Sequence, residues 1–135
     1  MKKIVPLILL LVSILPAFGQ KAPSCRVVAY YFHGTMRCPT CYRLEQYSKE
    51  AIENNFKSEL ASGKLEFKII NVEEKNNKHF IQDYQLYTKS LVISLVKDGK
   101  EAKSKNLSGI WELVGNKGKF FDYVTEEIRG FLKEI

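Results

Sequence analysis

The sequence predicts an α/β fold in which one mixed, four-stranded sheet carries helices on both faces. Segments rich in β-branched and aromatic residues alternate with segments whose apolar residues recur every three or four positions, which are the patterns of strands and helices. In addition, Asp98-Gly99 stands between two extended segments, and this dipeptide is typical of a tight β-hairpin. Together these observations predict the element order β-α-β-α-β-β-α.

The first three elements follow directly from the residue pattern. Residues 26–33 are β-branched and aromatic without a breaker, and they predict a buried strand. From Pro39 the apolar residues take helical spacing as far as Gly63, which is a good helix terminator. In residues 65–72, apolar and polar residues first alternate and are then followed by an apolar run, which predicts a second strand.

The remaining elements are a helix, a hairpin and a closing helix. Asn76 and Asn77 can cap a helix whose apolar face includes Phe80, Ile81, Tyr84 and Leu86. Strands are predicted at 91–96 and 101–107, followed by a short helical stretch around Trp111 and an amphipathic helix at 121–135. Since helical crossovers join the first three strands, we expect those strands to be parallel, with right-handed connections, and the last pair to be antiparallel.

The first nineteen residues have the layout of a cleaved secretory signal. Lys2 and Lys3 precede a largely apolar run of about a dozen residues, and Ala17 and Gly19 take the −3 and −1 positions of a cut. The run is shorter than the ~20 residues of a membrane-spanning helix. We therefore expect a signal peptide at 1–19, a single domain at 20–135, no membrane span after cleavage, and a periplasmic or secreted location.

The charge of the remaining chain indicates a solvated surface. Loss of the two leader lysines lowers the formal charge from +6 to +4, and the charges of residues 54–68 and 73–78 are of mixed sign. A nucleic-acid-binding protein would instead cluster its Lys and Arg residues. The sequence therefore predicts no nucleic-acid partner.

Two of the three cysteines form the motif Cys38-Pro39-Thr40-Cys41, directly after the first predicted strand and its loop. Pro39 suits the first position of a helix, which places Cys38 at the N-cap. The free N–H groups of the helix terminus and the neighbouring Arg37 stabilise a thiolate there. Cys38 could then attack a disulfide as the nucleophile, and Cys41 could resolve the mixed disulfide. This context is typical of thioredoxin-like redox proteins.

Two other roles for the motif remain open. A static disulfide could simply fix the start of the helix, or the two thiolates could bind a soft metal or a metalloid. A zinc site would need two more ligands, and the candidates Cys25, His33 and His79 have no recognised metal-site spacing. We therefore assign no metal ligand and no cofactor.

The other candidates have structural alternatives. His33 could support the thiols as a proton shuttle, although a strand-end histidine bonded to the loop is the simpler interpretation. His79 is expected at an exposed helical position. Cys25 is expected to be a free or partly buried thiol, although an odd cysteine in an exported protein could also pair with a second molecule. Trp111 is expected to pack at the edge of the core.

Residues 31–41 resemble the active-site region of a small thioredoxin-like family, named as a subunit of a nitrophenyl-compound nitroreductase. The resemblance continues through residues 79–90 and 107–114, including Trp111. It implies an accessory or electron-relay role beside a partner that carries a flavin.

The chain departs from thioredoxin itself at three points. Its inter-cysteine dipeptide is Pro-Thr, and Phe32 stands where thioredoxin has a buried aspartate. Ser90 or Leu91 takes the place of the proline that precedes the third strand in thioredoxins with a cis bond. That proline shapes substrate binding and keeps metals off the thiols, so its loss favours a specialised thiol pair over a general reductase. The sequence thus predicts exchange or electron relay with a partner protein, either a disulfide substrate or a reductase.

Overall fold

The computed structural model describes residues 21–135, so the predicted signal at 1–19 lies outside the described residues. Its strands form one sheet in the order β2-β1-β3-β4. The bounds of these strands are β1 Cys25–His33, β2 Leu65–Asn71, β3 Ser90–Lys97 and β4 Lys100–Asn106. The predicted α/β fold with a mixed, four-stranded sheet is confirmed.

The direction of β3 differs from the prediction. β1 and β2 are parallel, as expected, but β3 runs antiparallel to β1, with Ser90 opposite Phe32. The connection before β3 holds only a 3-10 turn, Lys75–Asn77, and the short helix α3, His79–Asp83. A five-residue helix is about 7.5 Å long and cannot return the chain along a seven-residue strand of about 23 Å. β3 therefore begins at the end of the sheet where β2 stops.

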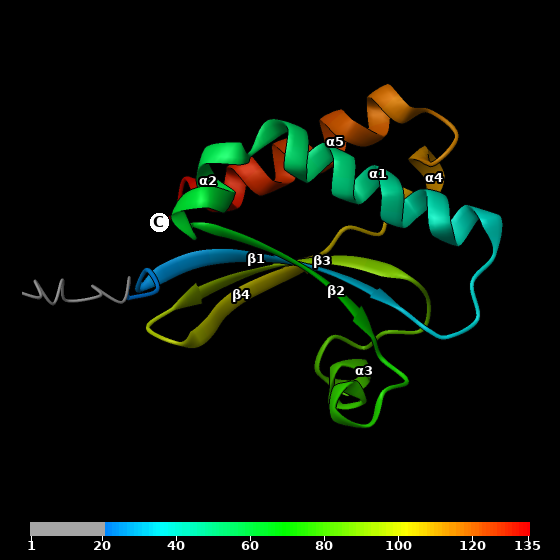
Figure 1. Ribbon diagram of the computed structural model, residues 1–135, viewed down its shortest axis with the longest axis horizontal. Helices are drawn as coiled ribbons and strands as arrows, with labels where there is room; N and C mark the ends of the chain where they lie inside the picture. The colour runs from blue at the N-terminus through cyan, green and yellow to red at the C-terminus, as the bar shows by residue number, and fades with distance from the viewer. Residues whose placement is uncertain (1–20) are drawn as a thin grey trace, which may run out of the picture.

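The helices lie on both faces of the sheet, as predicted (Figure 1). α1 (Pro39–Asn55), α2 (Lys57–Ser62), α4 (Ile110–Leu113) and α5 (Lys117–Leu132) cover one face. α3 lies alone against the other face, near the end of β1. The predicted helix from Pro39 to Gly63 is divided at Phe56, and Gly63 ends α2 with a φ of 77°.

The main core lies between the sheet and the pair α1 and α5. Because side chains alternate along a strand, Val27, Ala29 and Tyr31 of β1 all point to this face. Burial of a large apolar side chain contributes about 1.5–3 kcal/mol, so this layer fixes β1 beneath α1. The other members from the helices include Leu44, Ala51, Ile52, Phe120, Val124 and Ile128.

The opposite face of β1 is held by an aromatic cluster with α3. The rings of Phe32 and Phe80 lie 5.1 Å apart, and those of Tyr30 and Tyr84 lie 6.1 Å apart. The end of β1 is thus packed from both sides, which gives the loop that follows it a rigid starting point.

The predicted hairpin joins β3 and β4 through a two-residue turn. Asp98 and Gly99 both have positive φ, 51° and 78°, which is the backbone that an Asp-Gly turn provides. Within residues 21–135, no helix has both the length and the apolar character needed to cross a membrane.

Candidate functional site

Cys38 lies at the N-cap of α1, at the end of the loop that leaves β1. Its extended backbone, with φ −89° and ψ 167°, precedes Pro39 at the first helical position. The backbone N–H of Cys41 donates a hydrogen bond of 3.2 Å to the sulfur of Cys38. The helix terminus therefore provides an N–H donor and the positive end of its dipole to this sulfur, and both favour a thiolate.

The two cysteines form a disulfide, with their Cα atoms 5.0 Å apart. Cys38 is exposed, whereas only 4% of Cys41 is accessible. An external thiol or disulfide can therefore reach the sulfur of Cys38, whereas the surrounding side chains shield the sulfur of Cys41.

Tyr31 ties the inner cysteine to the sheet. Its hydroxyl donates a hydrogen bond of 3.0 Å to the backbone carbonyl oxygen of Cys41. Burial, followed by the nearby Glu45 carboxylate, raises the pKa of Tyr31, while Arg37 lowers it. The hydroxyl thus keeps its proton and acts as a donor at neutral pH.

Arg37 lies between the end of β1 and the second turn of α1. Its Nη1 donates to the carboxylate of Glu45 in a partly buried ion pair. Its Nη2 faces Nε2 of His33, while Nδ1 of His33 lies 2.8 Å from the carbonyl oxygen of Gly34. With its proton on Nδ1, His33 donates to Gly34 and accepts from Arg37 at Nε2. The Nε of Arg37 also lies 3.2 Å from Nδ1, and that contact is a hydrogen bond only in the other tautomer.

Two hydrogen bonds to Thr35 hold the start of the loop. The backbone N–H of Thr35 donates a 2.7 Å hydrogen bond to Glu73, and the amide of Asn71 donates to the Thr35 hydroxyl at 3.2 Å. The hydrogen bonds from Thr35 lower the pKa of Glu73. The carboxylate thus remains charged while it anchors the loop to the end of β2.

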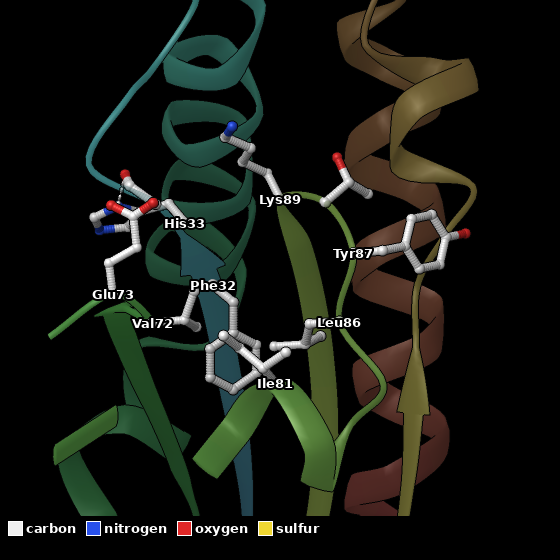
Figure 2. A pocket seen from close by; sticks show the side chains of 10 residues that line it. Phe32, His33, Val72, Glu73, Ile81, Leu86, Tyr87 and Lys89 are labelled. Atoms are coloured by element: carbon white, nitrogen blue, oxygen red, sulfur yellow. Dashed lines mark hydrogen bonds between the residues drawn. The ribbon is translucent and has the colours of Figure 1, made fainter. Parts of the chain in front are cut away.

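A small groove of about 240 Å³ opens beside this loop, at the end of the sheet (Figure 2). Phe32, Ile81 and Leu86 form its apolar floor, and His33, Glu73 and Lys89 stand above them. Typical small-molecule sites have ~300–1,000 Å³, so the groove is better matched in size to a single side chain of a partner.

A second groove, of about 360 Å³, lies between the segment before β3 and the segment after β4. Ser90 and Trp111 both line it. The indole N–H of Trp111 donates to the carbonyl oxygen of Lys89 at 2.9 Å, which fixes the entry to β3. Trp111 also packs against the core, as predicted, and no peptide bond in the part of the chain described is cis.

The structure brings some of the predicted residues together and separates others. His33, Arg37, Pro39 and the two motif cysteines share one end of the sheet. Cys25 begins β1 and therefore lies at the opposite end, and His79 is exposed on α3, where it pairs with Asp83. No group of three or more His, Cys, Asp or Glu side chains within residues 21–135 is arranged to hold a metal ion.

Three residues of this site were not predicted from the sequence: Tyr31, Glu45 and Glu73. Glu45 follows Cys38 by seven residues, which places both on the same side of the helix, so its spacing offered a signal. Tyr31 had the pattern of an ordinary core residue. Glu73 had no local signal, since its contact with Thr35 depends on the parallel pairing of β1 and β2.

No family model matches the sequence, and no curated protein matches it. Among solved structures, human ERp44 in its zinc-bound form is similar, with 17% identity and a TM-score of 0.51 over 77% of this chain and 26% of that one. Fasciola hepatica thioredoxin has 20% identity and a TM-score of 0.43, over 75% of this chain and 80% of its own. Trxlp from Edwardsiella tarda has 17% identity and a TM-score of 0.44, over 74% and 82%. The fold is thioredoxin-like, and the resemblance to nitroreductase subunits stays a prediction.

Proposed function

We propose that the chain exchanges disulfides with a partner protein through Cys38 and Cys41, outside the cytoplasm. The observation that supports this most directly is the asymmetry of the pair. Cys38 is exposed at a helix N-terminus, and Cys41 is buried one turn later and bonded to it. A nucleophile and a resolving thiol need this difference in access.

In the oxidised form, a partner thiolate attacks the sulfur of Cys38, and the sulfur of Cys41 leaves and takes up a proton. A second partner thiol, after losing its proton, attacks the partner sulfur of this mixed disulfide, and Cys38 leaves as a thiolate stabilised by the helix terminus. Two electrons pass to the cysteine pair, and the partner gains a disulfide. The same steps in reverse reduce a partner disulfide.

The surroundings of Cys38 support a protein as the partner. Met36, Tyr42 and Tyr87 are 83%, 57% and 92% exposed, and all lie on segments at this end of the sheet. Large apolar side chains gathered on a surface mark contact sites. With the two grooves, they place apolar surface at the same end of the sheet as Cys38, where a partner polypeptide would bind.

The decisive test is to equilibrate residues 20–135 in a series of glutathione ratios and count alkylated thiols by mass. We expect one reversible two-electron transition, which is retained in Cys25→Ser and lost in both Cys38→Ser and Cys41→Ser. A pair that stays oxidised under mild reduction would instead indicate a static disulfide. Thiols that are masked only when metal is added would indicate a dithiolate binding site.

A second experiment assigns the two sulfurs. Cys41→Ser, treated with oxidised glutathione, should retain one glutathione on Cys38, because no resolving thiol removes it. Cys38→Ser, treated in the same way, should react much more slowly, since Cys41 is buried. Equal adduct formation on the two variants would contradict the assigned roles.

Two narrower parts of the proposal have their own tests. If the leader is cut after Gly19, the protein released by cells that express the full chain should begin at Gln20. If the chain relays electrons to a flavin-dependent nitroaryl reductase, such an enzyme should lose turnover when Cys38→Ser replaces the unmodified chain.

A further inference from the structure

We propose that Glu45 controls the reactivity of Cys38 through Arg37, by offsetting the arginine charge that would otherwise stabilise the Cys38 thiolate. The inference rests on the proposed thiol chemistry and adds a residue that acts on it from the second turn of α1. Glu45 is a positioning and charge-compensating residue here, because it contacts Arg37 and not the sulfur.

The contacts hold the guanidinium of Arg37 in one place. It pairs with Glu45, faces the His33 ring, and lies 5.3 Å from the centre of the Tyr42 ring. The side chains of Arg37 and Glu45 are only 16% and 22% exposed. An ion pair with this degree of burial is screened less by water and salt than a surface pair.

The pair is close enough to the motif to influence it. Arg37 directly precedes Cys38, and consecutive Cα atoms are about 3.8 Å apart. Tyr31 is hydrogen-bonded to the Cys41 carbonyl. Burial raises its pKa most, Glu45 raises it further, and Arg37 lowers it. The two charges therefore act on the inner side of the motif with opposite signs.

The other charged groups at this end of the molecule have different partners or positions. Arg43 is exposed on α1, Glu73 accepts from Thr35, and Lys89 lies above the smaller groove. His33 contacts Arg37 and completes the set of groups around its guanidinium. Arg43, Glu73 and Lys89 keep their surroundings in both variants, and His33 loses its contact only in Arg37→Gln, so Glu45→Gln tests the charge of the pair without that change.

The sign of each substitution follows from charge. Glu45→Gln leaves the Arg37 cation uncompensated beside Cys38, which stabilises the thiolate, lowers the Cys38 pKa and raises the reduction potential of the pair. Arg37→Gln leaves the Glu45 anion uncompensated and has the opposite effects. If the ion pair only fixed the loop, both substitutions would break the same contact and shift reactivity in the same direction.

The experiment measures the alkylation rate of Cys38 by iodoacetamide in fully reduced protein from pH 4 to pH 9, with each cysteine followed by peptide mass. The thiolate forms an S–C bond and iodide leaves, so the rate profile reports the Cys38 pKa. We expect shifts of about half a unit to one unit, downward for Glu45→Gln and upward for Arg37→Gln. The double variant should return towards the unmodified protein, and Arg37→Lys should stay near it.

Glu127→Gln is the matched control, because Glu127 is also ion-paired, with Lys105, but lies on α5. It changes the net charge by the same amount and should leave the Cys38 profile unchanged. Shifts of the same sign in Glu45→Gln and Arg37→Gln, or shifts no larger than that of Glu127→Gln, would overturn the inference. A pair that cannot be reduced reversibly would overturn the proposed function instead, so the two failures are distinguishable.

Discussion

The hydroxyl of Tyr31 donates a hydrogen bond of 3.0 Å to the backbone carbonyl oxygen of Cys41. This contact joins the end of β1, one of the two inner strands of the sheet, to the first turn of α1, which carries the disulfide. Tyr31 is completely buried. Because burial raises its pKa, the hydroxyl remains protonated and the bond persists across the neutral range.

Tyr31→Phe should therefore lower the free energy of unfolding by about 1 kcal/mol, with the fold retained. The ring and its packing are kept, and a typical intramolecular hydrogen bond contributes about 0.5–1.5 kcal/mol. Guanidinium denaturation of the oxidised protein at pH 7 measures the change.

Tyr47→Phe is the control for this substitution. Tyr47 is a half-buried tyrosine of α1 that packs against Phe120, and its hydroxyl makes no hydrogen bond to the residues that the structure describes. Removal of the Tyr47 hydroxyl should leave the free energy of unfolding nearly unchanged. An equal loss in both variants would show that the Tyr31 bond contributes nothing specific.

The hairpin turn provides a prediction with an internal contrast. Gly99 has a φ of 78°, and a Cβ placed there would meet nothing within 4 Å, so the penalty for Gly99→Ala is conformational. We expect a loss of about 1 kcal/mol. Gly130 lies in the exposed part of α5, where Ala also meets no neighbour. Gly130→Ala should raise stability by about 0.5–1 kcal/mol.

Thermal unfolding of Gly99→Ala, Gly130→Ala and the unmodified protein measures both changes in stability. Opposite signs are expected because the same methyl group is added to a left-handed turn in one case and to a helix in the other. A stabilising Gly99→Ala would contradict the assigned turn geometry.

The elements that the sequence predicted well are those with strong local signals. β1 has an unbroken β-branched and aromatic run, Pro39 marks the start of α1, and Asp98-Gly99 marks the hairpin; each lies within a residue of its predicted place. These features depend on backbone preferences that act over a few residues. The position of the motif at a helix terminus follows from the same signals.

The direction of β3 could not be obtained in this way. The apolar spacing of Phe80, Ile81 and Tyr84 predicted a crossover helix. The helix is instead only five residues long, and the rings of Phe80 and Tyr84 pack on Tyr30 and Phe32. Gln85, with a φ of 51°, turns the chain soon after. The length of a helix, and hence the direction of the strand that follows it, depends on such tertiary contacts. The pairing of Arg37 with Glu45 is different, because the two residues are only eight positions apart and the helical spacing of Glu45 was a signal that the sequence contained.

The loop before the motif should show a dependence on pH through Glu73. Its hydrogen bonds from Thr35 lower its pKa below the ordinary value of 4.5. A lowered pKa in the folded state means that the charged carboxylate stabilises the fold above about pH 4.5, and that this stability is lost as the pH falls through the lowered pKa. Glu73→Gln should therefore be less stable than the unmodified protein at pH 7, and the difference should shrink as the pH falls through the lowered pKa.

Denaturation midpoints of both proteins across this pH range measure the effect. Glu74→Gln removes a neighbouring exposed carboxylate and should not reproduce it. A difference that stays unchanged as the pH falls from 7 into the acid range below 4.5 would show that the Glu73 charge is not what holds Thr35.

Cys25 should be irrelevant to any soft metal that the reduced motif binds. It begins β1, and Cys38 lies beyond the other end of this nine-residue strand. Eight steps of about 3.3 Å place the two ends about 26 Å apart, many times a metal–sulfur bond. Cd²⁺ titration of reduced protein, followed by its thiolate absorbance, should thus give the same affinity for Cys25→Ser as for the unmodified chain, whereas Cys38→Ser should weaken binding strongly. A weaker Cys25→Ser would mean that a second copy of the chain supplies the third sulfur, which a dependence of binding on protein concentration would reveal.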